Sequence, residues 1–308
     1  MFLPESVCPL VNRPRLGEAL SRSTDPLCYD AFTEGRAAKF DLHRASNFLM
    51  ETLATASDWL PFHPFFAFVV PRVMPLLFLT FAFALTAWGM RAVTFSGAFA
   101  GLIITAFIGL AAGLPAFLAI FTVFVLTFIA TRLGYGKKQR LGAAEHHEGR
   151  RASQVFANLG AAAMCAAPML FLPGVRGLLI GLTAALAEAA ADTVSSELGQ
   201  AFNDRPLLLT TLEPVAPGTD GGISFIGTIS GFIAACIVTA VAISSGLIYA
   251  HWFWLVVGGA MFGMFFDSLL GATLESPEGL SNDSVNFISS IFAAFFTLLI
   301  WLLIQIRS

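Results

Sequence analysis

The most constraining feature of this sequence is a stretch of 59 residues, from Val73 to Thr131, that contains a single charged residue, Arg91. Such a stretch cannot form a water-facing surface, but it can pass several times through a lipid bilayer. The composition agrees, because 56% of the 308 residues are hydrophobic and only 12% are charged, about half the charged fraction of soluble domains. The sequence therefore predicts an all-α integral membrane protein and disfavours a soluble enzyme.

Runs of about 17 to 25 apolar residues, the length of a membrane-spanning helix, recur along residues 71–308, the predicted transmembrane domain. Residues 1–70 are a polar N-terminal extension without the pattern of a cleaved signal peptide. Within it, the aromatic segment 59–70 is expected at the membrane interface, with a hydrophobic linker as the alternative. The eight candidate helices comprise residues 73–90, 94–112, 115–132, 153–172, 175–191, 222–246, 251–272 and 284–306.

Two segments of similar sequence, SGAFAGLIITA from Ser96 and SGFIAACIVTA from Ser230, suggest an internal repeat. Four predicted helices separate the two segments, so the copies would have the same orientation. They would then form a parallel repeat about an axis along the membrane normal. Chance similarity between helices rich in small residues is the alternative.

The loop 132–151 carries the densest basic cluster of the membrane domain, which places it on the cytoplasmic side. Alternation of the helices then puts the loops 199–221 and 273–283 on the same side. We expect a bacterial inner membrane, with the functional site on its cytoplasmic face. The same alternation puts the N-terminal segment, with seven Lys and Arg residues up to Arg72, outside. Either this segment is translocated or one span is miscounted.

Acidic residues recur in the second half of the chain, and ionisable side chains in membrane helices are costly and usually functional. Glu188 and Asp192 are four residues apart and share one face of a helix, whereas Glu197 lies roughly 140° from Asp192. We therefore expect the helix to end or unwind here if Asp192 and Glu197 face one site. For Glu188, a solvated helix end is the alternative.

The segment PVAPGTDGGISFIGTISG combines several glycines with the start of a predicted helix. Glycine lets the backbone approach a ligand closely, and a helix start offers free N–H groups and the positive end of the helix dipole. We expect Gly218, Gly221 and Gly222 to form a phosphate cradle. The alternatives are an ordinary loop and, for Gly227 and Gly231, packing between helices.

Further polar side chains follow at helical spacing in the predicted helices, led by Asp267 in one helix and Asp283 at the start of the next. Acids suit a cation that prefers oxygen ligands, such as Mg²⁺, and a glycine cradle suits phosphates, so the combination predicts a site for a metal-bound polyphosphate. Hydrogen bonding between helices is the alternative. The other polar candidates are Glu188, Asn158, Asn282 and Asn286.

Four runs, ADTVSSELGQAF, RPLLLTTLEPVAPGTDGGISFIGTISG, FDSLLGATLE and NDSVNFISS, resemble the multi-spanning family of transmembrane protein 19 and the phytyl-phosphate kinases. The resemblance covers about residues 75–308. The sequence differs from the phytyl-phosphate kinases at Gln200, where they have lysine, and at Ile226, where they have an acid, so phytyl phosphate is not fixed as the acceptor. The matching motif positions are Asp192, Thr193, Ser196, Glu197, Gly199, Thr210, Thr211, Pro217, Gly218, Thr219, Gly221 and Ser224.

This resemblance implies a membrane-embedded kinase that transfers a phosphoryl group from a nucleoside triphosphate, by resemblance CTP, to an isoprenyl monophosphate or related lipid. Asp192, Glu197 and Arg205 would be the catalytic residues. Mg²⁺ would be held by Asp192 and Glu197, with Asp267 or Asp283 as further ligands. We expect no nucleic-acid partner, and the oligomeric state stays open. The phosphates would be bound by Thr210, Thr211, Gly218, Thr219, Gly221, Gly222 and Ser224.

No lysine lies near the glycine segment, so arginines such as Arg150 and Arg151 would balance the phosphate charge, unless they only set the membrane orientation. The main alternative function is a secondary transporter or ion pathway in which Glu188, Asp192 and Asp267 relay protons or cations. A transporter needs these acids near the bilayer midplane with access to both sides. A kinase needs them at the cytoplasmic rim, and a non-catalytic scaffold needs none of them.

Overall fold

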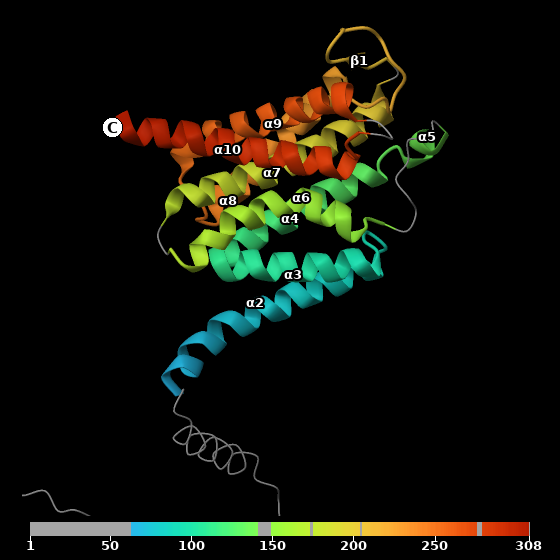
Figure 1. Ribbon diagram of the computed structural model, residues 1–308. Coiled ribbons are helices and arrows are strands. Elements are labelled where there is room, and N and C mark those ends of the chain that lie inside the picture. The colour runs from blue at the N-terminus through green and yellow to red at the C-terminus, as the bar shows by residue number, and fades with distance from the viewer. Residues whose placement is uncertain (1–62, 141–148, 173–174, 204, 276–278, 308) are drawn as a thin grey trace, which may run out of the picture. The chain divides into compact units, whose positions relative to one another are not determined.

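The protein is a bundle of long helices that lie side by side in the computed structural model (Figure 1). Seven of the described helices are long and apolar enough to cross a membrane, and the stretch Val73–Gly89 is a shorter apolar helix. The predicted all-α membrane fold is therefore confirmed. The structure describes residues 63–140, 149–172, 175–203, 205–275 and 279–307.

Each of the eight predicted helices is present, and two elements were not predicted: a short helix within the basic loop and a small antiparallel hairpin. The elements in chain order are α2 (His63–Gly89), α3 (Phe95–Ala112), α4 (Leu114–Arg132), α5 (Tyr135–Arg140), α6 (Ala152–Ala166), the 3-10 helix η3 (Ala167–Leu170), α7 (Arg176–Phe202), β1 (Leu207–Leu208), β2 (Gly222–Ile223), α8 (Phe225–Ser244), the 3-10 helix η4 (Ala250–Trp252), α9 (Phe253–Leu274) and α10 (Asn282–Arg307).

Helix boundaries differ from the predicted ones where a count of apolar residues could not place them. Helix α7 continues to Phe202, because polar side chains interrupt an apolar run without breaking a helix. Helix α6 changes to a 3-10 turn at Pro168, since proline lacks the N–H that would continue the α-helix. Helix α2 begins at His63, so residues 63–70 belong to the same helix as the first predicted span. Most of the predicted N-terminal extension, residues 1–62, lies outside the described residues.

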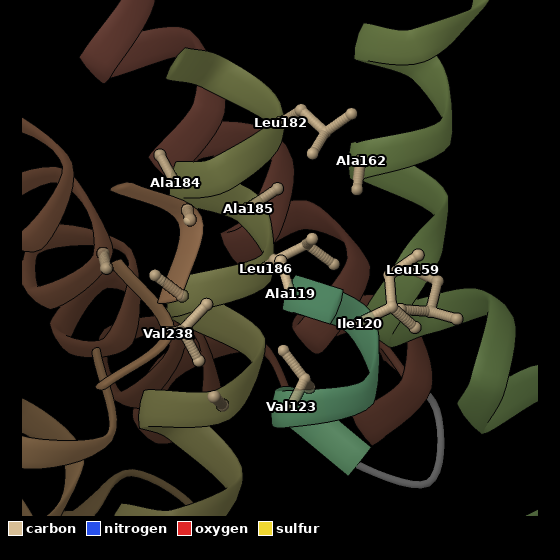
Figure 2. Packing of buried hydrophobic residues seen from close by; sticks show 14 of the residues in the cluster. Ala119, Ile120, Val123, Leu159, Ala162, Leu182, Ala184, Ala185, Leu186 and Val238 are labelled. Carbon is tan, nitrogen blue, oxygen red and sulfur yellow. The ribbon is translucent and has the colours of Figure 1, made fainter. Parts of the chain in front are cut away.

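Helix α7 is the centre of the bundle and packs against α4, α6, α8, α9 and α10. Its Leu182 and Leu186 are fully buried between α4, α6 and α8 (Figure 2). Alanines such as Ala184 and Ala185 alternate with them, and small residues let neighbouring helices approach closely. In a lipid environment this close packing, rather than hydrophobic burial, holds the helices together.

Four helix ends meet at one end of this bundle: α7 and α9 end there, and α8 and α10 begin there. The hairpin between α7 and α8 lies at the same end, where Leu207 pairs with Ile223 and Leu208 pairs with Gly222 (Figure 1). Helix ends expose polar backbone groups, so this end is suited to a polar site. Its cytoplasmic location and the parallel internal repeat stay predictions.

Candidate functional site

A polar cavity of about 230 Å³ lies where these four helix ends meet. Its walls come from the second half of α7, the glycine-rich residues 217–222, the Ser224 cap of α8, the last turns of α9 and the first turn of α10. The walls therefore combine the motif segments that the sequence analysis singled out, although these are far apart along the chain.

Five carboxyl side chains line this cavity, which we call the acid cavity. Asp192 and Glu197 come from α7, Asp220 from the glycine-rich loop, Asp267 from α9, and Glu275 directly follows α9. No Lys, Arg or His is among the described residues that line it. Carboxylates that share a site repel one another, so the cavity is suited to a cation with oxygen ligands.

Asp192 and Glu197 both line the acid cavity although α7 is continuous from Arg176 to Phe202. The expectation that the helix ends or unwinds near Asp192 is therefore wrong. The cavity instead follows a broad arc of the helix surface between Asp192 and Gln200. An arc of this width includes two side chains that are roughly 140° apart on a regular helix.

The carboxyl groups of Asp192 and Asp267 lie within hydrogen-bonding reach of each other, which links α7 to α9. Ser289 Oγ on α10 donates to Asp267 Oδ2 at 2.9 Å. The Asn286 amide, in the orientation that satisfies its neighbours, donates to the same oxygen at 3.1 Å. Two facing carboxyl groups must share either a proton or a cation, so this pair is the strongest cation-binding feature of the cavity.

The oxygen groups that line the acid cavity fit Mg²⁺ that is bound partly by the protein and partly by substrate phosphates and water. Among the described residues, no three His, Cys, Asp or Glu side chains are arranged as a metal site. Mg²⁺ is rarely held by an all-protein cage, however, and is usually bound through one or two carboxylates plus substrate phosphates and water. Asp192 and Asp267, with amide and hydroxyl oxygens beside them, supply that smaller set.

Glu188 lies one helical turn before Asp192 and is only 1% exposed. Ser289 Oγ lies 2.8 Å from its Oε1, and Ser290 Oγ donates to its Oε2. Because a hydroxyl has one proton, Ser289 can donate to only one of Glu188 and Asp267 at a time. Glu188 does not line the acid cavity and is not a solvated helix end. Because Ser289 also reaches Asp267, Glu188 holds α10 in the position from which its side chains contact the carboxyl pair.

The glycine-rich loop depends on two glycines with a left-handed backbone. Gly218 has φ of +88° and Gly221 has φ of +73°, a region that other residues adopt only with strain. Gly221 also packs directly on α9, because a Cβ built there would lie 2.5 Å from the backbone N and the Cβ of Ala272. The loop is therefore fixed against the wall that carries Asp267.

Some backbone N–H groups in the glycine-rich loop donate hydrogen bonds within the loop, and others donate to no other described residue. The amides of Thr219 and Gly222 donate to carbonyl oxygens within the loop at 3.2 and 3.0 Å, so they close the turn. The amides of Gly218 and Asp220 donate to no other described residue. These two N–H groups are the ones that a phosphate oxygen can use.

Packing between α7 and α8 uses glycine at two positions, as one of the alternatives predicted. A Cβ at Gly227 would lie 2.7 Å from Ser195 O, and a Cβ at Gly231 would lie 2.8 Å from Ala191 O. Ser224 caps α8 by accepting a hydrogen bond from Gly227 N at 3.0 Å, and it also lines the acid cavity. The two glycines thus bring the start of α8 against the segment of α7 that carries the carboxylates.

Several residues predicted for the site are not brought to the acid cavity. Arg205, Thr210 and Thr211 are exposed and do not line it, because the hairpin folds the segment between its strands back on itself. Asp283 also lies outside its lining, in the first turn of α10, where the helix dipole favours a carboxylate. Asn158 lines a separate apolar cavity beside α6. The predicted residues that do line the acid cavity are Asp192, Glu197, Gly218, Thr219, Gly221, Gly222, Ser224, Asp267, Asn282 and Asn286.

Asp220 and Glu275 line the acid cavity although neither was predicted as a site residue from the sequence. Asp220 lies within the glycine motif, and Glu275 follows Asp267 and Gly271 at four-residue steps, so the spacing already pointed to the same helix face. Burial, together with the charge of Asp220, raises the pKa of Glu275 from 4.5 to about 7. The negatively charged carboxylates of the acid cavity therefore repel one another in the absence of a cation.

The raised pKa of Glu275 predicts how stability depends on pH. The folded protein holds this proton more tightly than the unfolded chain, so the stabilising contribution is present below about pH 4.5 and is lost as the pH rises through about 7. Glu275→Gln should raise the melting temperature at pH 8 and change it little at pH 5. Thermal unfolding of the detergent-solubilised protein in EDTA measures this difference. Equal shifts at both pH values would contradict it.

Gly221→Val should destabilise the protein and displace the loop. The valine would add left-handed strain of about 1 kcal/mol or more and would also collide with Ala272 on α9. Gly246→Val is the matched control, because Gly246 has φ of +80° but nothing within 4 Å of a Cβ. We expect a clearly larger fall in melting temperature for Gly221→Val than for the control. Equal falls would mean that the contact with α9 contributes nothing.

Comparisons with known proteins identify the family. The model of the family described as integral membrane protein DUF92 matches residues 78–294. An uncharacterized membrane protein of Synechocystis sp. is 31% identical over 60% of this chain and 73% of its own length. An uncharacterized membrane protein of Methanocaldococcus jannaschii is 33% identical over 58% and 73%.

A plant relative also matches the membrane domain. Protein VTE6, chloroplastic, of Arabidopsis thaliana is 30% identical over 58% of this chain and 56% of its own length. No solved structure matches this chain. The family match covers the membrane domain from α2 to α10, including every wall of the acid cavity. This protein therefore belongs to the DUF92 family of integral membrane proteins.

Proposed function

We propose that this protein is a membrane-embedded kinase that transfers a phosphoryl group from a nucleoside triphosphate to an isoprenyl monophosphate or a related lipid phosphate. The acid cavity carries the proposal: the facing carboxyl groups of Asp192 and Asp267 lie beside a glycine-rich loop with unbonded amides. The motifs shared with the phytyl-phosphate kinases support lipid phosphate as the acceptor. We place the site on the cytoplasmic face, where nucleotides are found.

Asp192 and Asp267 would hold Mg²⁺, and Glu197 and the amides of Asn282 and Asn286 would position its water ligands. When bound, the cation neutralises the charge that develops on the transferred phosphoryl group. Gly218 and Asp220 would donate their backbone N–H groups to phosphate oxygens. These roles need no general base within the cavity.

The size of the acid cavity indicates which part of the nucleotide it holds. Its volume of about 230 Å³ is smaller than the roughly 300–1,000 Å³ of most small-molecule sites. The metal-bound phosphates fit such a space better than a whole nucleotide does. We therefore expect the base to lie near the exposed hairpin, and CTP stays the proposed donor on the motif resemblance alone.

The phosphoryl transfer needs no general acid or base. An oxygen of the lipid phosphate attacks the γ-phosphorus, the bond from the γ-phosphorus to the bridging oxygen breaks, and that oxygen leaves with the nucleoside diphosphate. The lipid becomes a diphosphate. Because the second pKa of a phosphate monoester is about 6, the acceptor arrives mostly ionised near neutral pH and no proton needs to be removed.

One observation favours the rival function of a proton or cation pathway. Glu188, Ser289 and Asp267 form a continuous chain of hydrogen bonds that ends at Asp192. A pathway also needs access from the far side of the membrane. Glu188 is fully buried, and Ala184 and Ala185, one turn further along α7, are both 0% exposed. The neighbours of Glu188 on that side of α7 are therefore closed to solvent.

Incubation with γ-labelled CTP, ATP, GTP and UTP, Mg²⁺ and a panel of isoprenyl alcohols and monophosphates tests the proposal. We expect label in a lipid diphosphate, with a monophosphate as acceptor and no label in EDTA. Folded protein that labels no lipid with any pair would contradict the kinase. Proton flux into liposomes that depends on Glu188 would then support the rival.

A further inference from the structure

A second cavity, of about 520 Å³, lies beside the acid cavity at the same end of the bundle. It is formed by the turn between α2 and α3, the last turns of α4 and the segment before α6. Three arginines line it, Arg91, Arg132 and Arg150, and no Asp or Glu is among its described lining residues. We call it the arginine cavity. Three guanidinium groups around one space are suited to a phosphate group.

Two of these guanidinium groups are held in place by neutral oxygens. Arg132 donates to Met90 O at 3.1 Å. Arg150 donates to Thr127 Oγ1 at 3.0 Å and to Thr131 Oγ1 at 3.4 Å. Bonds to carbonyl and hydroxyl oxygens fix the orientation of a guanidinium group. Both side chains are thus positioned in advance for an anion.

Arg91 occupies a backbone position that favours glycine. Helix α2 ends with hydrogen bonds from Arg91 N to Trp88 O and from Ala92 N to Ala87 O, and Arg91 itself has φ of +56°. Most helices that end in this way have glycine at the left-handed position. An arginine there costs backbone strain, and such strain is found most often at functional sites.

The arginine cavity borders an apolar cavity of about 80 Å³ inside the bundle. The two cavities share Val93, Phe124, Thr127 and Arg150. The apolar cavity is walled mostly by apolar side chains and glycines of α2, α3, α4 and α6. A charged space directly beside an apolar one matches a ligand with a charged head and a hydrocarbon tail.

The arginine cavity lies near the acid cavity. The charge of Arg150 acts on Asp192, the central carboxylate of the acid cavity. Gly134, next to Tyr135 in the lining of the arginine cavity, packs against Ala201 near the end of α7. A phosphate bound by the arginines would therefore lie near the carboxylates of α7.

We propose that the arginine cavity and the apolar cavity beside it bind a single-chain lipid monophosphate. Its phosphate would contact Arg91, Arg132 and Arg150, and the first part of its chain would lie between α2, α3, α4 and α6. As the acceptor site, this inference rests on the proposed kinase function. As a binding site, it stands on the two cavities alone and can be tested without a nucleotide.

The test measures binding of radiolabelled geranylgeranyl monophosphate to the full chain in phosphatidylcholine nanodiscs, with EDTA and without nucleotide. We expect saturable binding that geranylgeraniol and inorganic phosphate each compete for only weakly. Arg91→Gly should weaken binding by about tenfold or more while keeping the melting temperature, because glycine suits φ of +56°. Arg307→Gln, at the exposed end of α10, is the control for loss of one positive charge.

A second variant tests the tail independently of charge. Gly101→Leu would project into the apolar cavity, where the nearest atom to a new Cβ, Val155 Cγ1, is 3.7 Å away. We expect weaker binding of geranylgeranyl monophosphate and unchanged binding of isopentenyl monophosphate. Gly258→Leu is the matched control, because Gly258 is exposed on α9 with nothing within 4 Å.

Affinity that is unchanged in both Arg91→Gly and Gly101→Leu would overturn the proposal. Competition by inorganic phosphate as strong as by the lipid would also overturn it, since the cavity would then be an anion site only. These results are distinct from failure of the kinase proposal. Protein that binds the lipid phosphate in this way but transfers no phosphoryl group would keep this inference and remove the enzymatic one.

Discussion

Asp192→Asn is expected to lower phosphoryl transfer by about a hundredfold or more while leaving the melting temperature near that of the wild type. Asp192 is one of the two facing carboxyl groups that link α7 and α9 across the acid cavity. Asparagine keeps the size and one oxygen of the side chain but removes the negative charge that a divalent cation needs. Labelled transfer and thermal unfolding, measured on the same preparations, separate the two effects.

Asp283→Asn is the matched control for this prediction. It is the same substitution in the neighbouring helix α10, at a residue that does not line the acid cavity. The sequence alone assigned Asp283 to the metal, whereas its position predicts turnover close to the wild type. Equal losses in both variants would show that the cavity does not define the metal site. Loss of folding in Asp192→Asn would show that Asp192 is a structural residue.

Glu188→Ala is expected to reduce both stability and turnover. The substitution leaves a cavity in the most buried part of α7, removes the acceptor of Ser290, and removes one of the two carboxyl groups within reach of Ser289. A buried hydroxyl group that loses its partner, here that of Ser290, costs about 1–3 kcal/mol, and the missing volume adds to this. Turnover falls because Ser289 also donates to Asp267 and would lose its fixed position. Chemical unfolding in mixed micelles measures the first effect, and labelled transfer the second.

Glu188→Gln separates position from charge. Glutamine has nearly the same shape and keeps one oxygen that can accept from Ser289 or Ser290. If Glu188 only positions α10, Glu188→Gln should recover most of the stability and turnover that Glu188→Ala loses. If Glu188 relays protons, glutamine should abolish function as completely as alanine does, and the pathway hypothesis would gain.

The positions of the membrane helices could be predicted because one local property, an uninterrupted apolar run, determines them. The same rule failed at the end of α7, where the run stops near Asp192 but the helix continues to Phe202. Hydrogen bonding along the backbone, rather than apolar character, decides where a helix ends. The carboxylates of Asp192 and Glu197 therefore come from one rigid element.

Local motifs predicted part of the acid cavity but not how it is assembled. Asp192 and Gly221 were found within their motifs, whereas the pairing of Asp192 with Asp267 depends on how α7 packs against α9. Thr210 and Thr211 were assigned from a motif, and the hairpin holds them away from the cavity. A motif therefore identifies a segment of the chain but does not predict whether its side chains face the site in the folded protein.

The arginine cavity could not be read from the sequence. Arg91 lies between α2 and α3, Arg132 ends α4, and Arg150 directly precedes α6, and each is equally typical of a charge that sets membrane orientation. Only the packing of α2, α3, α4 and α6 brings them around one space and places that space beside an apolar one.

Binding of Mn²⁺, followed by electron paramagnetic resonance with and without CTP, tests most directly whether the acid cavity holds a metal-bound triphosphate. We expect one tightly bound Mn²⁺ per chain that requires the nucleotide, because the two facing carboxyl groups of Asp192 and Asp267 are too few ligands for a closed metal site. We also expect loss of this signal in Asp192→Asn and its retention in Asp283→Asn. Mn²⁺ binding that is absent with every nucleotide, or equal in all three proteins, would contradict this account.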